Sequence, residues 1–336
     1  MSTEQLCRLD LQCTRRAVLG GAAGLVAFAT SRTVLAQATY PNKPIRLVVG
    51  FAAGGPSDII GRVVGAKIGD ILGQQVYVEN RAGASGNIAT ETVARSDPDG
   101  YTLLLAPLSC AVNESLFKNF RIKFSESFAP IAPIAETAVV LVVHPSLNVS
   151  SVQQLVTLAK SKPGEVFYAT AGKGTATHLA AELFDTSAGI KMTPVHYKGG
   201  GETIKDLRSG EVKVMFSTIP PVLGFVRDGS LRGLATSGPK RDRTLPELPT
   251  IAESGVPGYD VRLWFGLAAP AGTPPAIVSK LSAATKQALE NDELKKALNA
   301  QGYEPLFGTA EEFGAFYRRE AEKWAKVIET VGSIGE

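Results

Sequence analysis

The chain has 336 residues, of which 44% are hydrophobic and 20% are charged, and its 35 Lys and Arg residues nearly balance 32 Asp and Glu residues. This composition excludes a disordered chain and a collagen-like repeat, and the length indicates about two domains. The small net charge of +3 also argues against a nucleic-acid-binding protein, which would concentrate basic residues on one face.

Residues 1–38 have the features of a cleaved export signal. The uncharged residues 17–31 follow Arg15 and Arg16, and this run is shorter than the roughly 20 apolar residues that a membrane-spanning helix needs. Small residues then fit a cleavage site, so we expect an exported, periplasmic protein that begins at Gln37 or Thr39. The paired arginines fit a twin-arginine signal, and a Sec signal is the alternative.

Cysteine usage indicates that the mature chain is held together without disulfides. Removal of the signal also removes Cys7 and Cys13 and leaves Cys110 alone. A chain of about 300 residues can bury roughly three quarters of its surface, so hydrophobic burial suffices. We expect Cys110 to be a small, unreactive hydrophobic side chain.

Short apolar runs alternate with helical periodicity along the mature chain, which predicts an α/β fold with right-handed crossovers. The first α/β unit has predicted helices from Ser57 and at 87–95 and predicted strands at 45–49, 75–79 and 101–106. The second has predicted helices at 151–161, 175–188 and 202–209 and predicted strands at 139–143, 166–170, 193–197, 212–217 and 231–236. A surface connection at 239–259 leads to a strand at 263–269 and then to amphipathic helices, whose aromatic stripe predicts core packing.

Motifs that would support catalysis are missing from the sequence. It has no Gly-x-Ser-x-Gly elbow and no Gly-x-Gly-x-x-Gly fingerprint after the first strand, and residues 171–175 lack the pattern of a phosphate-binding loop. The histidines, His144, His178 and His196, have no cysteine or carboxylate at metal-ligand spacing. We therefore expect a protein that is not an enzyme and that uses no metal or cofactor.

Two glycine-rich loops follow predicted strands and lead into predicted helices, at residues 51–58 and 171–178. Ligands of open α/β sheets bind at this edge, and the unpaired N–H groups of such turns favour an anion. A tight turn explains either loop alone, but one loop in each α/β unit predicts a cleft that holds a carboxylate.

Short segments that match one protein family, in that family's order, are spread over essentially the whole mature chain: residues 51–58, 73–75, 78–84, 97–102, 174–179, 197–200, 245–250, 253–258, 264–266 and 269–274. On these segments the chain resembles the substrate-binding proteins of tripartite tricarboxylate transporters, the Bug or TctC-type solute receptors. Ala176 and Glu202 depart from the pattern, because the family commonly has proline at the first position and small residues at the second.

The resemblance implies a periplasmic-binding-protein type II clamshell, in which two α/β domains enclose a ligand cleft. It places domain I at residues 39–137 plus 261–336 and domain II at residues 138–260. The implied function is the capture of a small carboxylate by a monomer that delivers it to the large and small membrane subunits of the transporter. The residues that it implies for the site are Phe51, Ala52, Ala53, Gly54, Gly55, Ala171, Gly172, Gly174 and Thr175 in the two loops and Ser109, Asp206 and Ser217 in the walls. To this set we add Asp58 and His178, which lie near the predicted helix starts.

Individual residues of this set keep alternative interpretations. Asp58 is explained equally well by the helix dipole and by contact with a ligand amine. For His178 a structural hydrogen bond to its loop is favoured over ligand contact, and Trp264 is expected in the core. Two other functions stay open, a periplasmic carboxylate-sensing receptor and a secreted enzyme on the same scaffold. The sequence does not identify the carboxylate.

Overall fold

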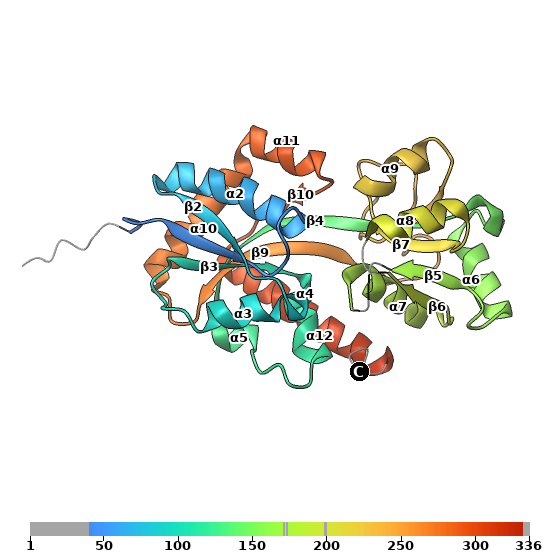
Figure 1. Cartoon of the computed structure of the whole chain (residues 1–336), viewed down its shortest axis with the longest axis horizontal. Coiled ribbons are helices and arrows are strands. Elements are labelled where there is room, and N and C mark those ends of the chain that lie inside the picture. The colour runs from blue at the N-terminus through green and yellow to red at the C-terminus, as the bar shows by residue number, and fades with distance from the viewer. Residues whose placement is uncertain (1–39, 171, 173, 198–199, 332–336) are drawn as a thin grey trace, which may run out of the picture. The chain divides into compact units, whose positions relative to one another are not determined.

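The computed structural model describes residues 40–170, 172, 174–197 and 200–331 (Figure 1). The predicted export signal, its cleavage site and Ala171 lie outside the described residues. The contacts divide the chain after residue 42, and every element described below lies in the unit Lys43–Glu336. None of the described helices is long and apolar enough to cross a membrane.

The described residues form a ten-stranded sheet with the order β2-β1-β3-β9-β4-β7-β5-β6, and β8 and β10 also pair with β4. The strands are β1 (Ile45–Val49), β2 (Val76–Asn80), β3 (Thr102–Pro107), β4 (Phe128–Val143), β5 (Phe167–Thr170), β6 (Thr193–His196), β7 (Val214–Thr218), β8 (Arg232–Thr236), β9 (Arg262–Pro270) and β10 (Glu304–Pro305). β1 is parallel to β2 and β3, and β5 is parallel to β6 and β7. Four of the five residues of β1 are buried, as expected for a strand covered on both faces.

The long strand β4 joins the two parts of the sheet. Its residues 128–138 pair with β9, and its residues 139–143 pair with β7 and β8. The ladder with β9 shifts register after Pro130 and again after Pro133, since proline has no N–H to donate. Sequence analysis predicted only residues 139–143 of this strand, because proline within an apolar run argues against a central strand.

Helices cover the sheet on both sides, and Figure 1 shows α2 and α11 above the strands and α3 and α12 below them. The α-helices are α2 (Pro56–Leu72), α3 (Asn87–Ala94), α4 (Leu108–Leu116), α5 (Phe124–Ser127), α6 (Val152–Ser161), α7 (Ala176–Ala188), α8 (Gly200–Ser209), α9 (Pro220–Arg227), α10 (Pro275–Glu290), α11 (Asp292–Ala300) and α12 (Ala310–Val331). Short 3₁₀ turns lie at Ala84–Gly86 and Pro145–Leu147.

The predicted α/β alternation is confirmed, and the boundaries differ from the prediction by a few residues. The predicted N-cap at Ser57 is wrong. α2 begins at Pro56 with Gly55 as its N-cap, because a proline fits the first helical position, where no N–H is needed. Helices α4, α9 and α11 were not predicted at all.

The aromatic stripe of α12 packs against β9, as predicted. Trp264 on β9 is fully buried and contacts the rings of Phe313 and Tyr317 at centroid distances of 6.0 and 5.7 Å. The buried carboxylate of Glu320 accepts hydrogen bonds from the indole N–H of Trp264 at 3.1 Å and of Trp324 at 3.3 Å. The predicted core position of Trp264 is therefore confirmed.

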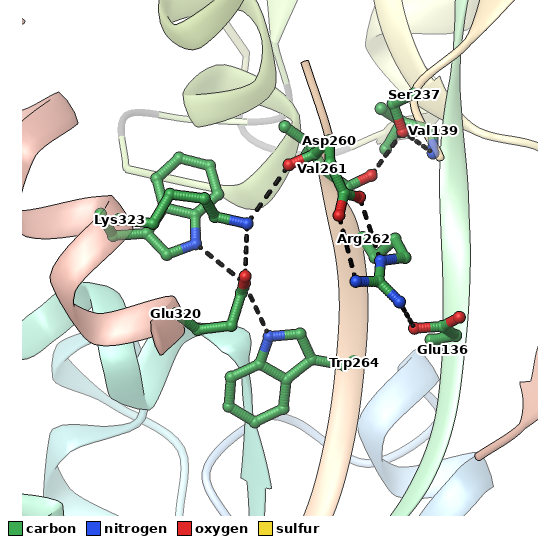
Figure 2. A network of polar contacts seen from close by, with 10 residues as sticks. Glu136, Val139, Ser237, Asp260, Val261, Arg262, Trp264, Glu320 and Lys323 are labelled. Atoms are coloured by element: carbon green, nitrogen blue, oxygen red, sulfur yellow. Dashed lines mark hydrogen bonds and ion pairs between the residues drawn. The ribbon is translucent and has the colours of Figure 1, made fainter. Parts of the chain in front are cut away.

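A polar network connects α12 to β4 and β9 (Figure 2). Arg262 on β9 donates to Glu136 Oε2 on β4 at 2.8 Å and to Asp260 Oδ1 at 3.0 Å. Lys323 on α12 donates to the main-chain oxygen of Asp260 at 3.2 Å. These contacts lie where residues 136–138 of β4 pair with the first residues of β9, next to the change of partners along β4.

Cys110 lies in α4 and is buried. Burial raises the pKa of its thiol to about 12. The thiolate, which is the reactive form, is therefore scarce at neutral pH, as the expected inert role requires.

Candidate functional site

The loop after β1 turns the chain into α2 through Gly54. This glycine has φ +80°, in the left-handed region that glycine adopts without strain. Its N–H donates to Asp58 Oδ2 at 2.8 Å, and the N–H of Gly55 donates to the main-chain oxygen of Ala52 at 3.3 Å. We call residues 51–55 the first loop.

Asp58 holds the first loop from the first turn of α2. Its side chain is only 5% exposed, and its carboxylate also accepts hydrogen bonds from Arg62 Nε at 3.0 Å and from Asn80 Nδ2 at 2.9 Å. Asn80 donates as well to the main-chain oxygen of Phe51 at 3.0 Å. The hydrogen bond from Arg62 outweighs burial and lowers the pKa of Asp58 to about 2. The carboxylate is therefore charged at physiological pH and engaged within the chain.

The loop after β5 turns the chain into α7 through Gly174, which has φ +74°. Its N–H donates to His178 Nδ1 at 3.0 Å, and the N–H of Thr175 donates to the main-chain oxygen of Gly172 at 3.3 Å. Thr175 is the N-cap of α7, and its Oγ1 accepts from the N–H of His178 at 3.4 Å. We call residues 172–175 the second loop.

The two loops share one hydrogen-bond pattern. In each, a glycine with positive φ donates its N–H to the side chain four residues later, in the first turn of the following helix. In each, the next residue donates its N–H to a main-chain oxygen three residues back. The pattern aligns Gly54 with Gly174 and Asp58 with His178.

His178 lies below the second loop with both ring nitrogens engaged. It is 3% exposed, and its Nε2 lies 3.4 Å from Glu182 Oε1. Because Nδ1 accepts from Gly174, Nε2 carries the proton of the neutral ring and faces the carboxylate. Tyr168 donates to the same carboxylate, and the His196 ring lies edge-on at a centroid distance of 4.9 Å. The predicted hydrogen bond of His178 to its loop is confirmed.

Burial raises the pKa of Glu182, but hydrogen bonds from His178 and Tyr168 outweigh it and lower the pKa. This carboxylate therefore carries its charge beside the imidazole at neutral pH.

These internal hydrogen bonds limit which main-chain donors can reach a ligand. The N–H groups of Gly54, Gly55, Gly174 and Thr175 are engaged inside their own loops. Within the described residues, no acceptor pairs with the N–H groups of Ala52, Ala53, Ala176 and Thr177. The exposed Ala52 and Ala53 are thus the open donors of the first loop, a distinction that the sequence could not make.

A cavity of about 260 Å³ lies at the start of α2. The described residues that line it carry no formal charge: Gly54, Pro56, Ile59, Thr137, Thr218, Pro220, Pro221, Gln301 and Tyr303. Sequence analysis found only Gly54 of this set. Most of the others lie in α9, between α11 and β10, or at the end of β7, and neither α9 nor α11 was predicted.

The remaining predicted site residues lie outside this cavity lining. Ser109 lies in α4, and its buried Oγ has no hydrogen-bond partner among the described residues. A Cβ built at Gly86 would lie 3.8 Å from this oxygen. Asp206, in α8, accepts from Tyr197 at 2.9 Å, and the buried Ser217 donates to the main-chain oxygen of Thr218 at 2.9 Å. Among the described residues, no group of three or more His, Cys, Asp or Glu side chains is placed to hold a metal ion.

Comparison with known proteins agrees with the resemblance. The sequence pattern of the tripartite tricarboxylate transporter family receptors, TctC, matches residues 60–333. The chain belongs to this TctC family. It is 37% identical to protein BugT of Bordetella pertussis over 297 residues, which cover 88% of this chain and 91% of BugT.

Solved structures of TctC-type proteins share the fold. The R. palustris protein Rpa4515 with adipate is 35% identical, with a TM-score of 0.75 over 87% of this chain and 98% of that one. MatC from Rhodopseudomonas palustris with bound malate is 29% identical, with a TM-score of 0.73 over 86% of this chain and 100% of MatC. The predicted α/β fold of a two-domain periplasmic solute-binding protein is therefore confirmed.

Proposed function

We propose that this TctC-family protein is a periplasmic receptor that captures a small carboxylate and delivers it to the membrane subunits of a tripartite tricarboxylate transporter. The observation that carries the proposal is the pair of similarly built loops with unpaired main-chain N–H groups beside them. These groups belong to Ala52 and Ala53 in the first loop and to Ala176 and Thr177 in the first turn of α7, directly after the second loop. Two structural relatives were solved with the carboxylates adipate and malate. The loops favour an anion, and the two relatives show small organic acids as ligands of similar proteins.

The loops would hold the carboxylate through main-chain donors. Ala52 and Ala53 supply the donors of the first loop, and Ala176 and Thr177 supply those of the second. The positive ends of the α2 and α7 dipoles add to the attraction for an anion. In this proposal the other predicted residues that the structure describes shape the walls around the ligand: Phe51, Gly55, Ser109, Gly172, Asp206 and Ser217.

The proposed domains place one loop on each side of the ligand. Residues 39–137 plus 261–336 carry the first loop, and residues 138–260 carry the second. Because β4 runs from residue 128 in one proposed domain to residue 143 in the other, closure would bend this strand rather than a flexible linker.

Titration calorimetry with an acid and its amide tests carboxylate recognition. Adipate and malate are the first probes, followed by the carboxamide of whichever acid binds. A carboxamide loses the charge and sets an NH₂ donor against main-chain donors, so its affinity should fall roughly a hundredfold. Arg95→Gln, at the exposed residue that follows α3, is the control and should leave acid binding unchanged. Equal affinities for acid and amide would refute the carboxylate site.

Uptake measurements distinguish transport from sensing. Deletion of the gene should abolish uptake of the acid that the purified protein binds. Normal uptake together with a lost transcriptional response to that acid would instead support the sensing alternative.

A further inference from the structure

Asp58 and His178 occupy equivalent places in the two loops. Each accepts the N–H of a glycine four residues earlier, at 2.8 Å for Gly54 and 3.0 Å for Gly174. Building on the proposed function, we infer that Asp58 and His178 are positioning residues that fix the two loops for ligand binding, and that only the second loop responds to pH. Neither side chain needs to touch the ligand for this role.

The first loop has an acceptor that does not change in the physiological range. Asp58 is buried and held by Arg62 and Asn80 as well as by Gly54. These partners keep the pKa of Asp58 near 2. The hydrogen bond to Gly54 is therefore present at every pH at which the periplasm operates.

The second loop depends on an imidazole nitrogen that accepts a hydrogen bond only while it carries no proton. Histidine is the side chain whose charge changes between about pH 5 and 8. When His178 gains its second proton, Nδ1 becomes a donor and faces the donating N–H of Gly174. Two donors cannot pair, so the glycine N–H loses its acceptor and the loop loses the contact that orients it.

The charged and polar groups around the imidazole come from α7 and from two neighbouring strands. The Glu182 carboxylate lies 3.4 Å from Nε2, and the N–H of Gly174, just before α7, donates to Nδ1. From the neighbouring strands, Tyr168 on β5 points its hydroxyl to Glu182, and His196 on β6 presents its ring edge. Asp185, one turn further along α7, is the remaining acidic group on this side of the helix; its Oδ2 accepts from the N–H of Met192.

The expected consequence is weaker ligand binding in acid. Loss of one neutral hydrogen bond that orients the second loop should reduce affinity about three- to tenfold between pH 7.5 and 5.5. A ligand acid that stays ionised over this range would be released because of a change in the protein rather than in the ligand.

Amide NMR tests the hydrogen bond without a ligand. In the ¹⁵N-labelled protein, the Gly174 amide shift should follow a single-proton transition between about pH 5 and 8, and the Gly54 amide should stay constant. The ring nitrogens of His178 should show the Nε2–H tautomer at high pH. In His178→Asn, whose Oδ1 occupies the place of Nδ1, the Gly174 transition should disappear. A Gly174 amide that does not titrate, or that titrates equally in the variant, would overturn the inference.

Titration calorimetry at pH 7.5 and 5.5 tests the effect on binding, with adipate or malate as the probe. His178→Asn keeps an acceptor and should keep the neutral-pH affinity within about twofold while losing the pH dependence. His178→Gln places its amide near Nε2 instead and should bind weakly at both pH values. His144→Asn is the matched control, because this histidine only caps the turn Pro145–Leu147, and it should keep the wild-type pH profile.

The two proposals fail in different ways. If His178→Asn keeps the wild-type pH dependence, the positioning role is wrong although carboxylate capture stands. If no acid binds at any pH, carboxylate capture fails, and the Gly174 amide profile alone decides the role of His178.

Discussion

Glu320 shows how one buried carboxylate can hold a core together. It is 6% exposed and accepts hydrogen bonds from two indole N–H groups and from Lys323. Glu320→Ala should destabilise the protein by about 2–5 kcal/mol, since it leaves two buried N–H groups without acceptors. Urea unfolding measures the change.

The matched control for Glu320 lies two residues further along α12. Glu322→Ala removes an exposed carboxylate from the same helix, and it should change stability by less than about 0.5 kcal/mol. Equal effects of the two variants would contradict the proposed bracing of the tryptophans.

Asp185, unlike Glu320, lowers the stability of the protein at neutral pH. Burial raises its pKa to about 7, and its Oδ1 is buried without a hydrogen-bond partner. Relative to an ordinary aspartate, stability is greatest below the unfolded pKa near 3.8 and falls as pH rises through about 7. The difference corresponds to at most about 4 kcal/mol.

Asp185→Asn should remove this penalty while keeping an acceptor for the N–H of Met192. We expect the variant to be more stable than the wild type at pH 8 and about equally stable at pH 4. Thermal unfolding across this pH range is the measurement. A gain that is the same at both pH values would show that the charge of Asp185 is not the cause.

At the scale of elements, the packing of α12 on β9 depends on a glycine. A Cβ at Gly266 would lie 2.0 Å from the ring of Phe313, so no larger residue fits without moving the helix. Gly266→Ala should destabilise the protein by about 1–3 kcal/mol or more through overpacking.

The control for this packing is a helical glycine at a position where an added side chain would meet no neighbour. At Gly201 in α8 a Cβ would meet nothing within 4 Å. Gly201→Ala should therefore be neutral or slightly stabilising, by up to about 1 kcal/mol. Denaturant midpoints of the two variants give the comparison, and similar losses would mean that the Phe313 contact is not decisive.

At the scale of the whole molecule, one contact joins the two proposed domains beside the cavity. A Cβ at Gly302, just before β10, would lie 2.3 Å from Pro220 at the start of α9. Gly302→Ala should hold these segments apart and so weaken ligand binding and enlarge the ligand-bound molecule. The wild type should show a smaller radius of gyration when its ligand is added.

Gly229→Ala is the control that distinguishes obstructed domain closure from backbone strain as the cause of an effect of Gly302→Ala. Gly229 has φ +78°, close to the +74° of Gly302, but a Cβ there would meet nothing within 4 Å. Both variants introduce similar strain, and only Gly302→Ala obstructs the contact. Solution scattering and calorimetry on both, with the acid that binds, should show an effect of Gly302→Ala alone. Equal effects would assign the change to strain.

The sequence by itself determined the α/β alternation, the family and the two loops, because each depends on local pattern. Apolar periodicity marks strands and helices, and glycines mark the turns between them. It also indicated that His178 bonds to its loop, since a residue in the first turn of a helix lies next to the loop that precedes it.

Only the tertiary structure decided which groups are open to a ligand. The N–H groups of Gly54 and Gly174 are engaged by Asp58 and His178, and this follows from loop geometry rather than composition. The cavity brings Gly54 together with Tyr303, far apart in the chain. Periodicity shows which face of an element is buried but not which distant element covers it, so this pairing arises only when β4 joins the two parts of the sheet.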